Sequence, residues 1–182
     1  SFFSMQAAHV LPGVEVFLKQ YVSLVKNQRV ALLTNQTGVD SKRRRTLDLL
    51  AAHPGVNLTL LFAPEHGVRG NLAAGKKVPG GRDSQTGLPV RSLYGGNDHR
   101  PDKVDLAKID TIIYDIQDTG CGAYTYIWTL AEVMAAAGVY GKRVIVFDRP
   151  DPFGGKIVDG PVTEKNFLSF IGLYPIPRVY GM

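Results

Sequence analysis

The stretch NLTLLFAPEHGVRG, residues 57–70, runs directly from a buried-strand pattern into a group of reactive side chains. A proline ends the apolar run, and Glu65, His66 and Arg69 then follow on a segment whose two glycines permit tight backbone turns. The pattern predicts a core strand that delivers a carboxylic acid to the surface of the protein.

Helix and strand patterns alternate before this stretch. Apolar residues at helical spacing predict an amphipathic helix that begins at Gly13 and includes Tyr21 on its apolar face. A strand over residues 29–33 follows, and Asp40 or Ser41 is expected to cap a second helix that leads into the opening stretch. Such a β-α-β unit is right-handed and builds a parallel sheet.

The later part of the chain repeats this order. We expect a strand over residues 110–116, a helix over residues 123–137 and a further strand over residues 142–147. Residues 71–89 show neither period and are expected to form a long loop, and the tail from Phe153 shows little periodic structure. The pattern predicts an α/β fold with a mainly parallel sheet.

Composition bounds the class of protein. With 182 residues, 45% hydrophobic and 20% charged, the chain is expected to form one globular domain over residues 13–182, after a terminal segment of residues 1–12. No apolar run approaches the roughly 18 residues that span a bilayer, so no membrane span is expected. The first nine residues fit either the end of a signal peptide or a disordered terminus.

Charge and cysteine content exclude further classes. The net charge is +5, but the basic residues are scattered apart from residues 42–45, which we interpret as a solvated helix face. No basic stripe is interleaved with aromatic residues, so we expect no nucleic-acid partner. The single cysteine, Cys121, excludes an internal disulfide and a cysteine-based zinc site.

Polar side chains follow each of the four predicted core strands, which end at TNQTG, PEHG, DIQD and DRPD. The carboxyl ends of parallel strands lie along one edge of the sheet, where ligands bind. That edge is expected to gather Asn35, Glu65, His66, Asp115, Gln117, Asp118, Asp148 and Arg149. Acids and amides in this number suit a polar, uncharged or mildly anionic ligand such as a sugar.

Each of these residues also has a structural interpretation. Asn35 can satisfy the backbone of its own turn, and Asp115 or Asp148 can cap a helix or pair with Arg149. Glu65 has no special role in turns, which favours a functional role.

Aromatic residues at the start of the helix after DIQD raise the same choice. Tyr124 is expected to face the same edge, whereas Tyr126 belongs to the inward stripe of that helix. Trp128 suits either packing or stacking on a sugar, and packing is the favoured interpretation.

Other chemistries find little support. Gly120-Cys121-Gly122 lacks the third glycine of a dinucleotide fingerprint, and no GxxxxGK[ST] loop occurs. The acids have no regular metal spacing, and no base is placed beside Cys121. We therefore predict no cofactor and no metal.

Six ordered motifs resemble a known family. They are TNQTGVDSKRRRTLDLL, LFAPEHGVRG, DSQTGLPVRSLYG, YDIQDTGCGAYTYI, FDRPDPFGG and LYPIPRVYGM. Together they resemble the exo-β-N-acetylmuramidase family, long catalogued as a domain of unknown function. The resemblance implies a Rossmann-like, three-layer α/β/α N-terminal domain and a smaller C-terminal domain that is absent from this chain, with the cleft between them.

The same resemblance implies an activity and a set of residues. Such enzymes release N-acetylmuramic acid from the non-reducing end of peptidoglycan fragments without a cofactor. By position, Glu65 is similar to the leading catalytic carboxylate, with His66, Asp115, Gln117 and Asp118 near the sugar. One departure is the sequence TGCGAY after DIQD, where the family pattern is V-G-x-R-F/Y-Y-T-Y.

These expectations combine into one hypothesis. Glu65, its pKa raised by a partly closed apolar cleft, is expected to act as general acid, and Asp118 first or Asp115 second as nucleophile, base or electrostatic stabiliser. Carboxyl groups ~5 Å apart would retain the anomeric configuration, and groups ~6.5–9.5 Å apart would invert it. Arg69 and Tyr124 are predicted to join the strand-end residues in binding substrate.

Two other functions and two compartments stay open. A non-catalytic glycan- or nucleotide-binding module obeys the same strand-end geometry, and a metal-dependent hydrolase would require a metal. Peptidoglycan fragments favour an exported protein, although recycled fragments also occur in the cytoplasm.

Overall fold

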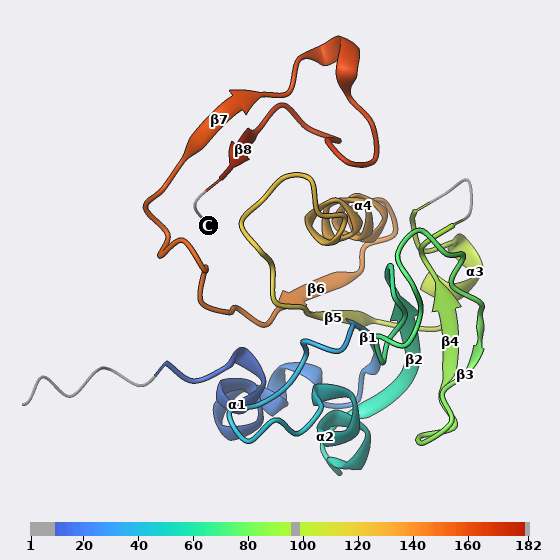
Figure 1. The fold of residues 1–182 in the computed structure, drawn as a ribbon. Helices are drawn as coiled ribbons and strands as arrows, with labels where there is room; N and C mark the ends of the chain where they lie inside the picture. Colours follow the sequence, from blue (N-terminus) through green and yellow to red (C-terminus); the bar gives the residue numbers. More distant parts are fainter. Residues whose placement is uncertain (1–9, 96–98, 181–182) are drawn as a thin grey trace, which may run out of the picture.

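The computed structural model describes residues 10–95 and 99–180, and its centre is a six-stranded sheet (Figure 1). The strand order is β3-β4-β2-β1-β5-β6, and all neighbours are parallel except β3 and β4. The strands are β1 (Arg29–Thr34), β2 (Asn57–Ala63), β3 (Gly81–Arg82), β4 (Pro89–Ser92), β5 (Thr111–Asp115) and β6 (Arg143–Val146). The predicted mainly parallel sheet is confirmed.

The chain winds outward from β1 in both directions. It passes from β1 to β2 and β4 on one side, then returns to β5 and β6 on the other. β1 and β5 are adjacent, with Leu33 beside Tyr114 and Thr34 beside Asp115. The reversal of direction between these two strands makes their carboxyl ends a topological switch point, where open α/β sheets bind ligands.

Helices cover both faces of the sheet, which gives three layers (Figure 1). One face carries the N-terminal helical segment and α2 (Thr46–Ala52), and the other carries α3 (Lys103–Leu106) and α4 (Tyr126–Val139). Val30 and Leu32 of β1 point to the first layer, and Ala31 and Leu33 point to the second. Because both faces are buried, the strands read as continuous apolar runs.

The N-terminal helical segment is confirmed, although it is not one regular helix. It comprises α1 (Gly13–Val16), a π-turn η1 (Phe17–Tyr21) and a 3-10 turn η2 (Val22–Val25). Phe17 packs on Phe147 with ring centroids 5.0 Å apart, but Tyr21 is 47% exposed. The prediction that Tyr21 faces the core is therefore wrong.

The predicted cap of the second helix is also wrong. Neither Asp40 nor Ser41 caps α2, which begins later, at Thr46. Asp40 instead accepts hydrogen bonds from the backbone N–H groups of Lys42 and Arg44 in a turn. The basic residues 42–45 consequently precede the helix, and the first three of them are exposed to solvent.

The tail, expected to be aperiodic, contains a two-stranded antiparallel hairpin. Its strands are β7 (Asp159–Val162) and β8 (Pro177–Val179), separated by a 3-10 turn η3 (Lys165–Phe167). β8 and the residue after it contact the loop that follows β5, since Gly122 N–H donates to Arg178 C=O at 2.8 Å and Tyr180 N–H donates to Gly120 C=O. The tail thereby reaches the switch-point edge of the sheet.

The sheet is open at β6. Among the described residues, this strand pairs with β5 alone, and its Val146 is 48% exposed. A groove of about 880 Å³ lies beside it, lined by apolar residues that include Leu11, Phe17 and Phe147. Among the described residues, no helix is long and apolar enough to span a membrane.

Candidate active site

Glu65 lies on the loop immediately after β2, and three other segments meet at its carboxylate. Its Oε1 atom accepts a hydrogen bond from Gly75 N–H at 2.9 Å, and Oε2 accepts one from the Thr125 hydroxyl at 2.9 Å. The Tyr94 hydroxyl also donates to it. The carboxylate is partly exposed and held at the edge of the sheet, as the sequence predicts.

The pKa of Glu65 does not behave as expected. Burial on its own would raise this pKa, but hydrogen bonds from Gly75, Thr125 and Tyr94, together with the nearby His66, outweigh burial and hold it below its usual value. The prediction of a raised pKa is wrong for the described chain. Glu65 is ionised here at neutral pH.

His66 supports this loop through its backbone and its ring. It adopts a left-handed conformation with φ of 68°, which turns the chain sharply after Glu65. Its Nδ1 atom is 2.8 Å from the carbonyl oxygen of Leu72. His66 thus lies beside the candidate carboxylate and holds the following loop.

Asn35 satisfies the backbone of its own turn, as its structural interpretation predicts, and its side-chain amide nitrogen has no regular hydrogen bond among the described residues. It is 2% exposed, and its Oδ1 accepts hydrogen bonds from the backbone N–H and the hydroxyl of Thr37, at 2.8 and 2.6 Å. Its Nδ2 atom is buried without a hydrogen bond of regular geometry among the described residues. Burial raises the pKa of the neighbouring Tyr126; the Asn35 amide opposes this rise, and the charge of Glu65 adds to it. Asn35, Tyr126 and Glu65 therefore lie together.

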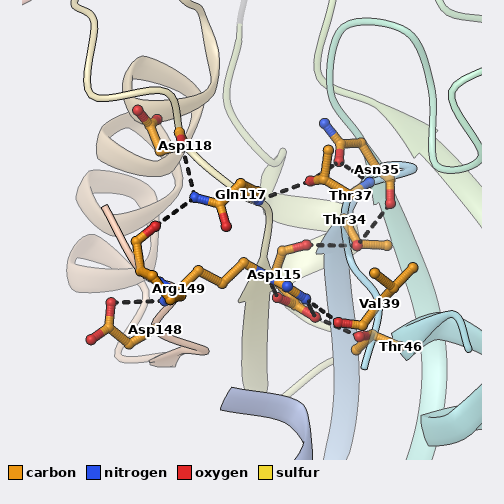
Figure 2. Close-up of polar contacts among 11 residues, drawn as sticks. Thr34, Asn35, Thr37, Val39, Thr46, Asp115, Gln117, Asp118, Asp148 and Arg149 are labelled. Atoms are coloured by element: carbon orange, nitrogen blue, oxygen red, sulfur yellow. Dashed lines mark hydrogen bonds and ion pairs between the residues drawn. The ribbon is translucent and has the colours of Figure 1, made fainter. Parts of the chain in front are cut away.

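Asp115 and Arg149 form a buried ion pair at the ends of β5 and β6 (Figure 2). Asp115 has no exposed surface; burial raises its pKa, and Arg149 and the Thr46 hydroxyl oppose that rise. Arg149 also donates to the carbonyl oxygen of Val39 at 2.9 Å. The pairing proposed as a structural alternative is thus observed, and an inaccessible Asp115 does not fit the role of a reacting carboxylate.

Gln117 ties three strand-end loops together (Figure 2). Its backbone N–H donates to the Thr37 hydroxyl at 2.8 Å, and its Nε2 donates to the carbonyl oxygens of Asp118 and Pro150, each at 2.9 Å. These bonds fix the loops after β1, β5 and β6 relative to one another.

Asp118 and Tyr180 form a second polar contact in the same region. Asp118 Oδ1 accepts hydrogen bonds from Gly120 N–H, at 2.8 Å, and from the Tyr180 hydroxyl. Tyr180 is 7% exposed; burial, followed by the hydrogen bond to Asp118, raises its pKa. Tyr180 was not predicted as a site residue, because the tail that carries it has no periodic signal.

A cavity of about 270 Å³ lies at the ends of β5 and β6. Four residues of the predicted set form part of its lining, namely Gln117, Asp118, Asp148 and Arg149. Asp151 and Tyr180, which were not predicted, add further polar groups, and the rest of the lining is mainly apolar. The structure therefore brings the DIQD and DRPD residues together, whereas Glu65 lies with Asn35, Tyr94, Thr125 and Tyr126.

Arg69 takes part in a separate ion-pair network, and Tyr124 lies at the surface near Tyr126. The Arg69 guanidinium pairs with both carboxylate oxygens of Asp83, at 2.6 and 2.8 Å, and with Asp48 at 2.9 Å. Tyr124 is 50% exposed. Arg69 thus holds the loop before β4 to α2, and its predicted contact with substrate remains a prediction, as does that of Tyr124.

Two further expectations concern Trp128 and metal binding. Trp128 is 2% exposed and donates from Nε1 to the carbonyl oxygen of Gly122 at 2.9 Å, so the packing interpretation is confirmed. Within residues 10–95 and 99–180, no group of three or more His, Cys, Asp or Glu residues is arranged to hold a metal ion.

Comparison with known proteins supports this picture. The family model described as exo-β-N-acetylmuramidase NamZ, N-terminal, matches residues 30–182. The peptidoglycan β-N-acetylmuramidase NamZ of Bacillus subtilis is 43% identical over 173 residues, which cover 95% of this chain and 42% of that protein.

Two crystal structures of DUF1343 family proteins from Bacteroides fragilis share the fold. One superimposes with a TM-score of 0.86 at 44% identity, covering 94% of this chain and 43% of the other. The second gives 0.79 at 35% identity, covering 96% and 44%. The Rossmann-like three-layer fold is confirmed, and the chain spans about two fifths of the length of these relatives.

Proposed function

The chain belongs to the exo-β-N-acetylmuramidase NamZ family and matches its N-terminal model over residues 30–182. We therefore propose that it forms one side of the active-site cleft of a peptidoglycan glycosidase, the side on which Glu65 lies. The substrate would be the non-reducing end of a peptidoglycan fragment, from which N-acetylmuramic acid is released. The remaining part of the family fold would complete the cleft. The observation that carries the proposal is the Glu65 carboxylate, held by three donors at the edge of the sheet.

The proposed role of Glu65 is to protonate the glycosidic oxygen as it leaves. This role requires a proton, whereas the hydrogen bonds in the described chain favour the ionised form. The Gly75 N–H group belongs to an exposed part of the loop, so substrate can displace it. Loss of that donor and exclusion of water by the completed cleft would both raise the pKa of Glu65, so substrate binding would favour the protonated carboxylic acid.

A second assignment follows from the same lowered pKa. An ionised Glu65 is suited to act as general base or as nucleophile, roles that require a carboxylate. Of the two predicted partners, Asp118 is better placed, because it lines a cavity while Asp115 is completely buried.

Glu65→Gln separates these assignments in the protein at its full natural length. A muramyl glycoside with a sugar leaving group needs an acid, whereas one with a 4-nitrophenol leaving group does not. If Glu65 is the acid, turnover of the first substrate falls about 10²–10⁴-fold and the second substrate is largely spared. Loss of turnover on both substrates supports the base or nucleophile role. Glu164→Gln, at an exposed tail position, is the matched control and is expected to leave both rates unchanged.

One outcome contradicts the role of Glu65, and two others contradict the glycosidase proposal itself. Full turnover of the sugar substrate by Glu65→Gln shows that Glu65 is not essential. Binding of muramyl glycosides without turnover by the full-length protein supports the non-catalytic binding module instead. Loss of activity on chelation would favour a metal-dependent hydrolase.

Since its proposed substrate lies in the cell wall, we also propose that the protein is exported, which fractionation of cells tests.

A further inference from the structure

The cavity at the ends of β5 and β6 combines apolar walls with a polar rim. Its walls include Ile116 from the end of β5, Ile127 and Leu130 from α4, and Phe147 after β6. Its volume of about 270 Å³ lies just below the range of about 300–1,000 Å³ that holds a complete drug-sized ligand. The cavity therefore fits a substituent of a sugar rather than an oligosaccharide.

The charges on the rim select against an anion. Asp118, Asp148 and Asp151 each contribute a carboxylate. Arg149 is the cation among the described lining residues, and its charge is balanced by the buried Asp115. A carboxylate entering this cavity would meet net negative charge, whereas a neutral group that donates a hydrogen bond would find acceptors.

The Asp118 side chain is oriented with one oxygen left for a ligand. Gly120 N–H and the Tyr180 hydroxyl both donate to Oδ1. Within the described part of the chain, no donor reaches Oδ2. Tyr180 is itself fixed, because it is almost buried and its backbone N–H donates to Gly120 C=O. A hydrogen bond to an ionised acceptor held in this way is of the stronger kind.

The geometry points to this cavity as the receptor for the acetamido group of the substrate sugar. Asp118 Oδ2 accepts the amide N–H, and the acetyl methyl group packs against Ile127 and Leu130. Tyr180 is a positioning residue that acts through Asp118. The inference rests on the proposed function, since N-acetylmuramic acid carries this neutral group beside an anionic lactyl group. The rim acids direct the lactyl group away from the cavity.

The test compares two neutral sugars that differ at this substituent. N-acetyl-D-glucosamine and D-glucose are titrated into the protein at pH 7, and dissociation constants are measured by NMR. We expect the acetylated sugar to bind at least about tenfold more tightly, which is a lower bound for the combined effect of one hydrogen bond to a charged group and a buried methyl group.

Three variants locate this preference in the cavity. Asp118→Asn keeps the shape but presents a donor to the ligand, and Ile127→Phe fills the apolar wall. Both are expected to reduce the preference to near unity. Tyr180→Phe removes the hydroxyl alone and is expected to reduce the preference several-fold. The control Tyr140→Phe changes an exposed tyrosine at the end of α4 and leaves the preference intact.

A preference that persists in both Asp118→Asn and Ile127→Phe, with the melting temperature retained, overturns the inference, as does the absence of any preference in the wild type. If a variant unfolds, the other two still decide the matter. Glu65→Gln separates this inference from the proposed function. Normal turnover in Glu65→Gln with the acetamido preference still located in the cavity refutes the acid role alone. Loss of turnover in Glu65→Gln with a preference that is independent of the cavity refutes the receptor alone.

Discussion

Arg149 holds both carboxylate oxygens of Asp115, with Nε 2.6 Å from Oδ1 and Nη2 3.0 Å from Oδ2, at a point where Asp115 has no exposed surface (Figure 2). The pair joins the loop after β6 to the end of β5. It therefore fixes the backbone from which the Gln117 and Asp118 side chains extend.

Arg149→Met is expected to lower the free energy of unfolding by about 3–5 kcal/mol, because it leaves Asp115 charged and buried without its partner. Urea denaturation measures the change. The double variant Asp115→Asn/Arg149→Met should recover part of the loss, since no uncompensated charge remains. Arg29→Met, which breaks the exposed pair with Asp110, should cost much less. Equal losses at both pairs would contradict this account.

The ion pair of Asp83 with Arg69 makes the stability of the protein sensitive to acid. Hydrogen bonds from Arg69, opposed by burial and aided by Thr86, hold the pKa of Asp83 well below its usual value. Because the pKa of Asp83 is lower in the folded than in the unfolded state, the ion pair stabilises the fold at any pH above the unfolded pKa of about 3.9. This stability is lost as the pH falls from there toward the folded-state pKa.

Asp83→Asn should therefore flatten the dependence of the urea midpoint on pH between about pH 5 and pH 2. The control Asp159→Asn, at an exposed position of β7, should leave the dependence as in the wild type. An unchanged pH dependence in Asp83→Asn would exclude this pair as its source.

Thr125→Val removes one of the three hydrogen-bond donors to Glu65 while it keeps a side chain of similar size. The pKa of Glu65 should rise, because donors to a carboxylate favour its ionised form. NMR titration of the Glu65 carboxyl carbon measures the direction. Thr125→Ser retains the hydroxyl and should leave the pKa close to that of the wild type; a rise in Thr125→Ser as large as in Thr125→Val would point to packing.

Gly38→Ala tests the close packing at the switch point. A Cβ atom at this position would lie 2.1 Å from the Thr34 hydroxyl oxygen and 2.9 Å from the carbonyl oxygen of Asp115. We expect a loss of about 1–3 kcal/mol in the free energy of unfolding, measured by urea denaturation. Gly138→Ala, in α4, adds a carbon that meets no atom of the described residues within 4 Å apart from the neighbouring backbone of its own helix, and should stabilise the protein by about 0.5–1 kcal/mol. Similar effects at the two glycines would show that packing at Gly38 is not limiting.

The parallel sheet and the position of Glu65 could be predicted from the sequence because both rest on local patterns. The apolar run of β2 is buried on both faces, and its end is marked by Pro64. Which strand-end acid is buried could not be predicted in this way. Asp115 and Asp118 belong to the same four-residue motif, yet Arg149 and Thr46 enclose the first while the second lines a cavity.

The direction of the Glu65 pKa shift also required the three-dimensional structure. Its donors Gly75 and Thr125 lie 10 and 60 positions further along the chain, and no sequence motif around either of them predicts the contact. The tail hairpin was missed for a related reason. The exposed β7 lacks the apolar alternation of a half-buried strand, so its pairing with β8 leaves no periodic signal.

The open edge of β6 is expected to limit the concentration at which this chain stays in solution. Its unpaired backbone groups and the half-exposed Val146 offer a template on which a second molecule can add a strand, and the apolar groove beside it enlarges the adhesive surface. We therefore expect concentrated solutions of this chain to aggregate slowly from this strand, which light scattering would detect. Val146→Lys would place a charge on this edge strand and should slow the aggregation.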